Sequence, residues 1–371
     1  MSQPPARPRR GRKKLSKQLA AWMAAGIGGL AVLGSAVAGA DKFASSVAHL
    51  LDVVDARSIV DGSKPDSLEK LITEGAIDWR PIQKPQDHHV LVAAFVSSGD
   101  GLQHVIVATG RGDLDEYWFG EGGRDAGQRA FKVQSDQPGA TIVDLAAYYS
   151  DFDGMNHVVL LDSRGTVRDA SYSPGRGQPA FRVLATVPHA LHIAAAPFED
   201  AREQKVAVVV AAERQTIKLL SFDDRGDHIQ QKDADLDVVD RVEDLAAFWV
   251  PSTGRLHVLA VTGDSRDTTV RDYWSAGAAF DRRTIEVGQP AQRIAGFDTG
   301  GAYLTIAVAG KGNVLATTRV GEASAVPDES EAELSGLQIG GIAGYYYEGD
   351  SYRHIMIAST NGGVYEIWFR S

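Results

Sequence analysis

The sequence predicts an all-β fold, a six-bladed β-propeller with four-stranded blades of about 50 residues, preceded by an N-terminal transmembrane helix. Three observations lead to this prediction. A short apolar line recurs six times at a nearly constant interval, and each recurrence is followed by further strand-like runs separated by turn residues. A long uncharged apolar segment precedes the first recurrence. The chain has 371 residues and no cysteine, so disulfides, thiolate metal sites and a cysteine nucleophile are excluded.

The recurring line consists of a large aliphatic residue, two small residues and, in most repeats, an aromatic residue. It begins at Val92, Leu145, Ile193, Leu245, Ile294 and Ile342, at intervals of 53, 48, 52, 49 and 48 residues. Internal repeats of this length indicate a repeat architecture. The small residues, Ala-Ala or Ala-Gly, suit the strand nearest the central axis of a ring, because the backbones converge there.

Each repeat continues with a second apolar run, a turn rich in Gly, Asp, Arg or Asn, and a third run; a weaker fourth run closes most repeats. Four short strands per repeat are typical of propeller blades. The runs last four or five residues and are rich in Val and Ile, which excludes helical repeats. The last repeat lacks a fourth strand, and the strand-like segment 76–82 precedes the first repeat. We therefore predict that this segment forms the outer strand of the last blade and closes the ring.

The N-terminal segment carries the signals of a membrane anchor. Residues 1–17 hold seven Lys or Arg residues and no acid, and residues 18–40 hold no charge. From Leu19 to Ala40 a helix would span about 33 Å, which matches a hydrocarbon core of about 30 Å. The positive-inside rule then places a basic tail (1–17) in the cytoplasm, a transmembrane helix (18–40) in the plasma membrane and the rest outside the cytoplasm. The alternatives are a signal peptide cleaved near Ala40, which yields a secreted protein, and a buried soluble helix.

Residues 41–75 are expected to form a stalk helix and linker, because apolar residues recur there at helical spacing before a Gly-Ser-Lys-Pro break. Residues 76–371 form the predicted propeller. The net charge of the chain is −10, so once the seven N-terminal positive charges are set aside the remainder carries −17. A body this acidic repels nucleic acids, and we expect no nucleic-acid partner.

Histidine follows a pattern across the repeats. Repeats one, two, four and six open the second run with a histidine and carry an acid in the third run. These candidate pairs are His104–Glu116, His157–Asp169, His257–Asp272 and His354–Glu366. Repeats three and five lack both: Lys205 and Tyr303 precede their second runs, and Leu219 and Ala316 stand at the acid place. Because neighbouring antiparallel strands bring such positions together, we interpret the pairs as structural hydrogen bonds within a blade. A catalytic or metal-binding role is the alternative.

Two further groups of residues are assigned structural roles. Trp118, Trp274 and Trp368 follow the acids by two residues, and we expect them to fill the space between adjacent blades, with sugar stacking as the alternative. The acidic cluster Asp233, Asp235, Asp237, Asp240, Glu243 and Asp244 is interpreted as a solvated rim.

No nucleophile elbow, zinc-protease motif, phosphate-binding loop or dinucleotide fingerprint occurs. We therefore predict no catalytic residue, no metal site and no cofactor.

In architecture, residues 76–371 resemble six-bladed β-propeller repeat proteins, and the His–acid pairs are similar to those in tryptophan–aspartate repeat blades. The resemblance names no specific family and implies the fold alone. We expect a membrane-anchored extracytoplasmic binding or scaffold module for a protein, a glycan or a small ligand. The alternative is a propeller hydrolase or lyase, similar to glycosidases or lactonases. An enzyme would need polar residues converging on the central channel, and a binding module would show an apolar or aromatic patch on one rim.

Overall fold

The computed structural model describes residues 77–370 except for short stretches at 84–89, 110–111, 121–125, 134–138, 175–177, 201–202, 213–215, 224–228, 234–235, 237–240, 265–266, 277–278, 288, 301–302, 311–313, 322–329 and 334–337. The predicted basic tail (1–17), transmembrane helix (18–40) and stalk (41–75) lie outside the described residues. Within the part of the chain that is described, no helix is long and apolar enough to cross a bilayer.

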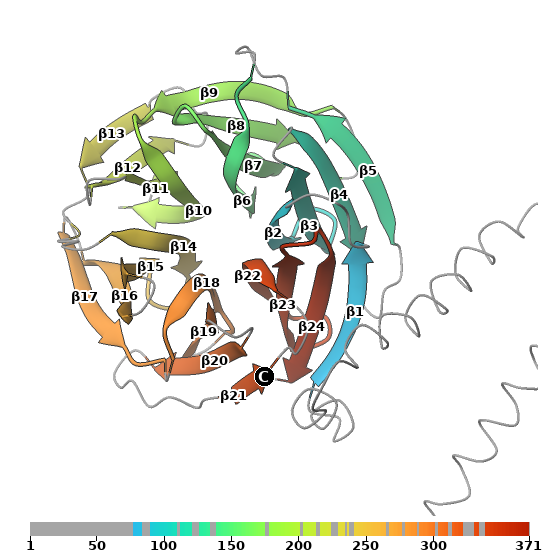
Figure 1. The fold of residues 1–371 in the computed structure, drawn as a ribbon. Helices are drawn as coiled ribbons and strands as arrows, with labels where there is room; N and C mark the ends of the chain where they lie inside the picture. Colours follow the sequence, from blue (N-terminus) through green and yellow to red (C-terminus); the bar gives the residue numbers. More distant parts are fainter. Residues whose placement is uncertain are drawn as a thin grey trace, which may run out of the picture. The chain divides into compact units, whose positions relative to one another are not determined.

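Six antiparallel four-stranded sheets surround a central axis, which confirms the six-bladed β-propeller (Figure 1). Blade one contains β2 (Val90–Ser97), β3 (Leu102–Thr109), β4 (Asp113–Phe119) and β5 (Gly127–Lys132). Blade two contains β6 (Ile142–Ser150), β7 (Met155–Asp162), β8 (Thr166–Tyr172) and β9 (Ala180–Thr186). Blade three contains β10 (Ala190–Asp200), β11 (Glu203–Ala212), β12 (Thr216–Asp223) and β13 (Ile229–Asp233).

The other three blades follow the same order from the axis outward. Blade four contains β14 (Val242–Val250), β15 (Arg255–Asp264), β16 (Asp267–Ala276) and β17 (Ala279–Ile285). Blade five contains β18 (Ala291–Asp298), β19 (Tyr303–Gly310), β20 (Val314–Gly321) and β21 (Ser330–Glu333). Blade six contains β22 (Ile339–Tyr347), β23 (Tyr352–Ser359) and β24 (Val364–Arg370), and its outer strand is β1 (Ile77–Gln83).

The ring is closed by the first and last strands of the described chain. β1 pairs antiparallel with β24, with Ile77 opposite Phe369 and Arg80 opposite Glu366. The predicted closure by segment 76–82 is therefore confirmed. Without β1, the outermost ladder of β24 would be an open edge with unpaired backbone groups.

The hydrophobic core consists of six layers, each between two neighbouring blades. One layer, for example, joins Val159 of blade two to Val208 of blade three, and another joins Phe248 of blade four to Ile306 of blade five. The second strand of a blade is buried on both faces, as in β3 and β7, which accounts for its continuous apolar run. Stability therefore arises from contacts between neighbouring blades repeated around the ring.

The small residues of the recurring line are explained by close contact between innermost strands. A Cβ atom added at Gly296 of β18 would lie 2.4 Å from Leu259 Cδ1 and 2.6 Å from Phe248 Cε1 in blade four. At Gly344 of β22 an added Cβ would lie 2.5 Å from Phe297 Cε1 of blade five. The aromatic residue that ends the line in one blade thus occupies the space that a glycine leaves in the next blade.

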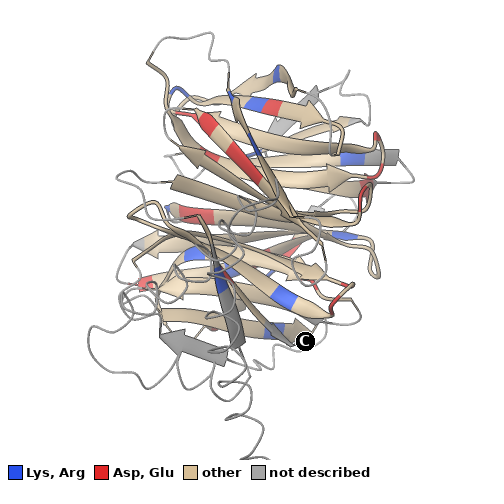
Figure 2. Cartoon of the chain, turned by 90° about the vertical axis from the view of Figure 1, so that its right-hand side faces the viewer, with Lys and Arg blue, Asp and Glu red and all other residues tan. Residues whose placement is uncertain are grey.

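From the side, acidic and basic residues are interspersed over the visible strands instead of gathering in one patch of a single sign (Figure 2). This mixed pattern reflects the many ion pairs that join neighbouring strands, of which those to buried carboxylates are described below.

Candidate functional site

The structure brings the members of all four His–acid pairs together. In each pair the imidazole Nδ1 lies 2.8–3.0 Å from a carboxylate oxygen; the pairs are His104–Glu116, His157–Asp169, His257–Asp272 and His354–Glu366. All eight side chains are buried. The acid stands diagonally from the histidine across the second and third strands, as Glu116 lies opposite Ile106, two residues beyond His104. Blade four keeps this diagonal because its longer hairpin absorbs the extra three residues.

Blades three and five lack the pair, but the strand register changes which residues replace it. Ala207 and Thr305 occupy the histidine position, since they lie opposite Ala196 and Phe297 as His104 lies opposite Phe95. Lys205 and Tyr303, which precede the second runs in the sequence, do not stand at this position, because the hairpins of blades three and five differ in length from the others. Leu219 does stand at the acid position of blade three, whereas in blade five Thr317 stands there in place of Ala316.

Each paired acid also binds an arginine on the fourth strand, directly opposite it in the register. Arg182 lies 2.9 Å from Asp169 and Arg283 lies 2.8 Å from Asp272. Arg129 donates to Glu116 and Arg80 donates to Glu366. The sequence reading missed these arginines. The fourth run is the weakest, and the arginine of blade six comes from β1 at the other end of the propeller.

An aromatic residue on the innermost strand completes each network by stacking on the histidine. The ring centroids are 4.9–5.3 Å apart with nearly parallel planes, and the stacks are Phe95–His104, Tyr148–His157, Phe248–His257 and Tyr345–His354. Four blades therefore carry an aromatic–His–acid–Arg series, one residue per strand from the axis outward. Because the histidine, the acid and the arginine of each series are hydrogen-bonded to one another across three strands, the series fixes the strands relative to one another.

The three tryptophans lie next to the arginines of the His–acid–Arg series. Trp118, Trp274 and Trp368 are half-buried and lie beneath the arginines of their own blades, at 5.4–6.0 Å from guanidinium carbon to ring centroid. The arginines themselves reach the neighbouring blade: Arg129 lies 4.3 Å from the ring of Tyr172, and Arg80 lies 3.9 Å from that of Phe119. Arg129 and Arg80 thus make cation–π contacts between neighbouring blades, and a space-filling role for the tryptophans there stays a prediction.

In three blades the second imidazole nitrogen also contacts a carboxylate. The Nε2 atoms of His104, His157 and His354 lie 3.0–3.3 Å from Asp100, Asp153 and Asp350, each four residues earlier in the turn between the first two strands. Burial opposes the charged imidazolium, but the hydrogen bonds to Asp153 and Asp169 outweigh it and raise the pKa of His157 to about 9. The pKa of His104 is raised for the same reasons, by Asp100 and Glu116.

A second set of residues lies on the innermost strands, around the axis of the ring. The residue before the recurring apolar line stands at the same level of each innermost strand; these six residues are Leu91, Asp144, His192, Asp244, Arg293 and Gly341. In blades two to six a register shift, marking a β-bulge, falls just before this position. A bulge re-aims the side chain that follows it and is frequent beside functional sites. Blade one shows no such shift between Val90 and Ser97.

Asp144, His192 and Asp244 form a compact group, called the channel triad below. His192 Nδ1 lies 3.5 Å from Asp144 Oδ2 and 3.8 Å from Asp244 Oδ1. The side chains are only 14–19% exposed. Each carboxylate accepts a hydrogen bond from the backbone of the following blade. Asp144 Oδ2 of blade two accepts from the Ile193 N–H of blade three at 2.9 Å, and Asp244 Oδ2 of blade four accepts from the Ile294 N–H of blade five at 2.8 Å. These bonds fix both carboxylates in place.

Electrostatics couple the three groups of the triad. Burial raises the pKa of Asp244 to about 6, against the opposing charges of Arg293 and His192. Burial alone would lower the pKa of His192, but Asp144 and Asp244 raise it. Asp244 was expected in a solvated acidic rim, and that expectation is wrong for this residue, because the bulge after Val242 turns it inward. Asp233, Asp235, Asp237 and Asp240 have no described side chains.

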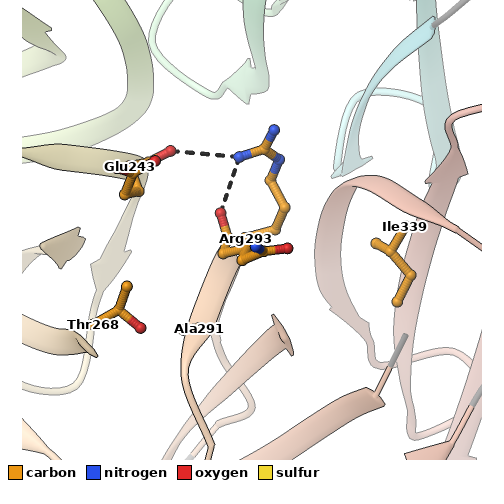
Figure 3. Close-up of a pocket in the computed structure, with 6 residues that line it drawn as sticks. Glu243, Thr268, Ala291, Arg293 and Ile339 are labelled. Carbon is orange, nitrogen blue, oxygen red and sulfur yellow. Dashed lines mark hydrogen bonds between the residues drawn. The ribbon is translucent and has the colours of Figure 1, made fainter. Parts of the chain in front are cut away.

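Arg293 borders a cavity beside the triad. The cavity has a volume of about 190 Å³ and is lined by Glu243, Thr268, Ala291, Gln292, Arg293 and Ile339 (Figure 3). The guanidinium of Arg293 donates to three backbone carbonyl oxygens, those of Gly340 at 2.7 Å, Gln292 at 2.9 Å and Glu243 at 3.4 Å. Within the described chain, Arg293 therefore donates to carbonyl oxygens and not to the carboxylates of Asp144 and Asp244. Those carboxylates lie near His192 and accept from backbone N–H groups.

Aromatic residues gather at the opposite, C-terminal ends of the innermost strands. We call Tyr149, Phe198, Trp249, Tyr346 and Tyr347 the aromatic rim; all five are half-buried. Phe198 and Trp249 of adjacent blades lie 6.3 Å apart between ring centroids. The Tyr347 hydroxyl donates to the Gly101 carbonyl of blade one at 3.0 Å. The turns beside these rings carry Asp100, Asp151 and Asp153.

No protein-family model matches the sequence, and no curated protein matches it. Among solved structures, AofleA from Arthrobotrys oligospora is similar over 80% of this chain and 87% of its own, with 8% identity and a TM-score of 0.56. The phage phi92 endosialidase is similar over 80% of this chain and 69% of its own, with 7% identity and a TM-score of 0.56. The fucose-recognising lectin of Aleuria aurantia, a six-bladed propeller, has 15% identity over 61% of this chain and 74% of its own, with a TM-score of 0.49. At these identities the similarity shows the β-propeller fold alone.

Proposed function

We propose that the chain is a glycan-binding propeller that recognises neutral sugars at the aromatic rim. The rim itself is the observation that carries the proposal. It gathers five half-buried aromatic rings at the ends of the innermost strands. Asp100 and Asp153, in turns at the same end of the blades, keep 21% and 28% of their side chains exposed. The C–H face of a sugar ring packs on an aromatic face while its hydroxyl groups donate to carboxylates, so this combination suits a sugar.

The charge of the molecule selects among glycans. The chain after residue 40 carries a net charge of −17, and the rim turns contribute Asp100, Asp151 and Asp153 to it. Anionic glycans are repelled by such a surface, whereas neutral sugars are not. The similarity of fold to a phage endosialidase supports a carbohydrate as the ligand class, while the charge favours uncharged sugars over sialylated ones.

The alternative of a propeller hydrolase has a carboxylate pair in its favour, Asp144 and Asp244, at the channel. In two-carboxylate glycoside hydrolysis the scissile bond lies between the two groups. Here His192 occupies that space, with Nδ1 3.5 Å and 3.8 Å from the two acids. A sugar cannot enter between them, and binding is the function that the geometry supports better.

Binding of the purified full-length chain to an array of neutral and sialylated glycans tests the proposal. We expect neutral glycans to bind and Trp249→Ala to weaken the binding about tenfold, the effect of losing one aromatic stack. Trp274→Phe is the matched control, since Trp274 lies in the same blade but beneath Arg283 on β16, two strands away from the innermost strand that carries Trp249. Binding of sialylated glycans only, or equal losses in both variants, would contradict the proposal.

We further propose that residues 18–40 hold the propeller at the outer face of the plasma membrane. The proposal rests on the uncharged segment 18–40 and the seven positive charges before it. A C-terminal alkaline phosphatase fusion is expected to be active, and the chain is expected to stay in the membrane fraction after alkaline carbonate extraction. An inactive fusion contradicts the topology, and release into the medium supports cleavage near Ala40 instead.

A further inference from the structure

The distances within the channel triad are too long for hydrogen bonds and too short for unrelated groups. An N–H···O bond to a carboxylate spans about 2.7–3.2 Å, whereas His192 Nδ1 lies 3.5 Å and 3.8 Å from the two carboxylate oxygens. The candidate ligand atoms all lie within 4.8 Å of one another. A tetrahedron with metal–ligand bonds of about 2.0–2.2 Å has edges of about 3.3–3.6 Å. One spacing of the triad, 3.5 Å, falls in this range and a second, 3.8 Å, lies just above it, so a small inward movement of the side chains would place all three ligands around one ion.

We propose that Asp144, His192 and Asp244 bind one first-row divalent metal ion, best matched by Zn²⁺, at the wall of the central channel. One imidazole nitrogen and two carboxylate oxygens suit zinc and manganese, whereas calcium prefers six to eight oxygen ligands. Three protein ligands leave a fourth tetrahedral position for a water molecule or a ligand atom. This site is independent of the aromatic rim and goes beyond the proposed glycan binding.

The surroundings of the triad support ion binding in two ways. First, backbone N–H groups orient the carboxylates: Ile193 and Ile294 bond the Oδ2 atoms, and Leu145 bonds Asp144 Oδ1 at 2.8 Å. Such outer hydrogen bonds are typical of metal-binding carboxylates. Second, within the described chain the guanidinium of Arg293 donates to backbone carbonyl oxygens and not to the two carboxylates, so the carboxylate oxygens keep lone pairs that can face a cation.

The topology explains why such an ion would matter to the fold. The three ligands come from β6, β10 and β14, the innermost strands of three consecutive blades. An ion bound to all three links blades two, three and four, and it binds the folded ring but not the unfolded chain. By linkage it raises the melting temperature. Blades five, six and one contribute Arg293, Gly341 and Leu91 at the same level, so the ion lies to one side of the axis.

Isothermal titration calorimetry on the full-length chain in detergent, without a histidine tag and after chelator treatment, tests the proposal with ZnCl₂, MnCl₂, CaCl₂ and MgCl₂. We expect one Zn²⁺ per chain, weaker Mn²⁺ and no Ca²⁺ or Mg²⁺ binding. Asp144→Asn, His192→Gln and Asp244→Asn should each weaken Zn²⁺ binding by at least about 100-fold, more than outer partners do. Glu243→Gln, which removes the same charge next to Asp244, should stay within about threefold of the natural chain.

Two further measurements keep the proposal falsifiable if a variant folds poorly. Zn²⁺ should raise the melting temperature of the natural chain and of Glu243→Gln, but not that of Asp244→Asn. A crystal grown with Zn²⁺ should show an anomalous difference peak between the three side chains. Three results would overturn the proposal: no one-site binding, equal affinity in all variants, or an anomalous peak only elsewhere, for instance beside His157 and Asp153. Protonated His192 would then be the cation that balances the carboxylates of the triad.

Discussion

Arg80 of β1 donates a hydrogen bond to Glu366 of β24, although 286 residues separate them in the sequence. The two residues lie directly opposite each other in the closing strand pair. The guanidinium of Arg80 also lies over Phe119 of blade one at 3.9 Å and over Trp368 at 5.7 Å. One side chain thus joins the N-terminal strand, the last blade and the first blade.

Arg80→Ala is expected to lower the free energy of unfolding by about 3 kcal/mol, because it removes the guanidinium partner of the fully buried Glu366. Arg80→Lys should recover part of the loss, since lysine keeps the charge but not the planar fork. Urea unfolding followed by tryptophan fluorescence measures both. Arg164→Ala, on an exposed turn, serves as a surface control. A loss below about 0.5 kcal/mol for Arg80→Ala would show that β1 closes the ring without this contact.

The sequence predicted the blades and the His–acid pairs because both repeat. The apolar line beginning at Val92 or Leu145 recurs six times, and histidine and acid occur together or not at all. The arginines were missed because the fourth strand is weakly patterned and Arg80 lies outside the repeats. The channel triad was missed for the opposite reason: its position holds Leu91, Asp144, His192, Asp244, Arg293 and Gly341. Because the residue type at this position differs from each repeat to the next, comparison of the repeats does not reveal it. Four polar or charged residues directly before an apolar run could nevertheless have pointed to the position.

A double-mutant cycle tests whether the His157–Asp169 pair acts as a structural unit. Each of His157→Ala and Asp169→Ala should lower the free energy of unfolding by about 1–3 kcal/mol, since a buried partner is left unsatisfied. The double variant should cost less than the sum of the two, because the interaction is lost only once. Urea unfolding supplies the four free energies. Additive losses would mean that the two side chains contribute separately to stability.

Stability should fall at alkaline pH through the titration of His157. Its pKa is raised from 6.5 to about 9 in the folded chain, so its contribution is fully present below about pH 6.5 and is lost as the pH rises through about 9. The shift corresponds to about 3 kcal/mol. His104, whose pKa is also raised, acts in the same direction. Urea unfolding between pH 6 and pH 10 measures the slope, and His157→Gln should flatten it. An unchanged slope in this variant would assign the alkaline loss to other groups.

Gly296→Ala is expected to lower the free energy of unfolding by about 1–3 kcal/mol, the cost of overpacking a filled core. The added methyl group would lie 2.4 Å from Leu259 Cδ1 and 2.6 Å from Phe248 Cε1, and Phe248 cannot retreat freely because it stacks on His257. Gly341→Ala is the matched control: it also lies on an innermost strand, but its nearest neighbour would be Ala358 Cβ at 3.9 Å. Thermal unfolding of both variants measures the difference. If Gly296→Ala were as stable as Gly341→Ala, the small residues of the recurring line would not be required by contact between blades.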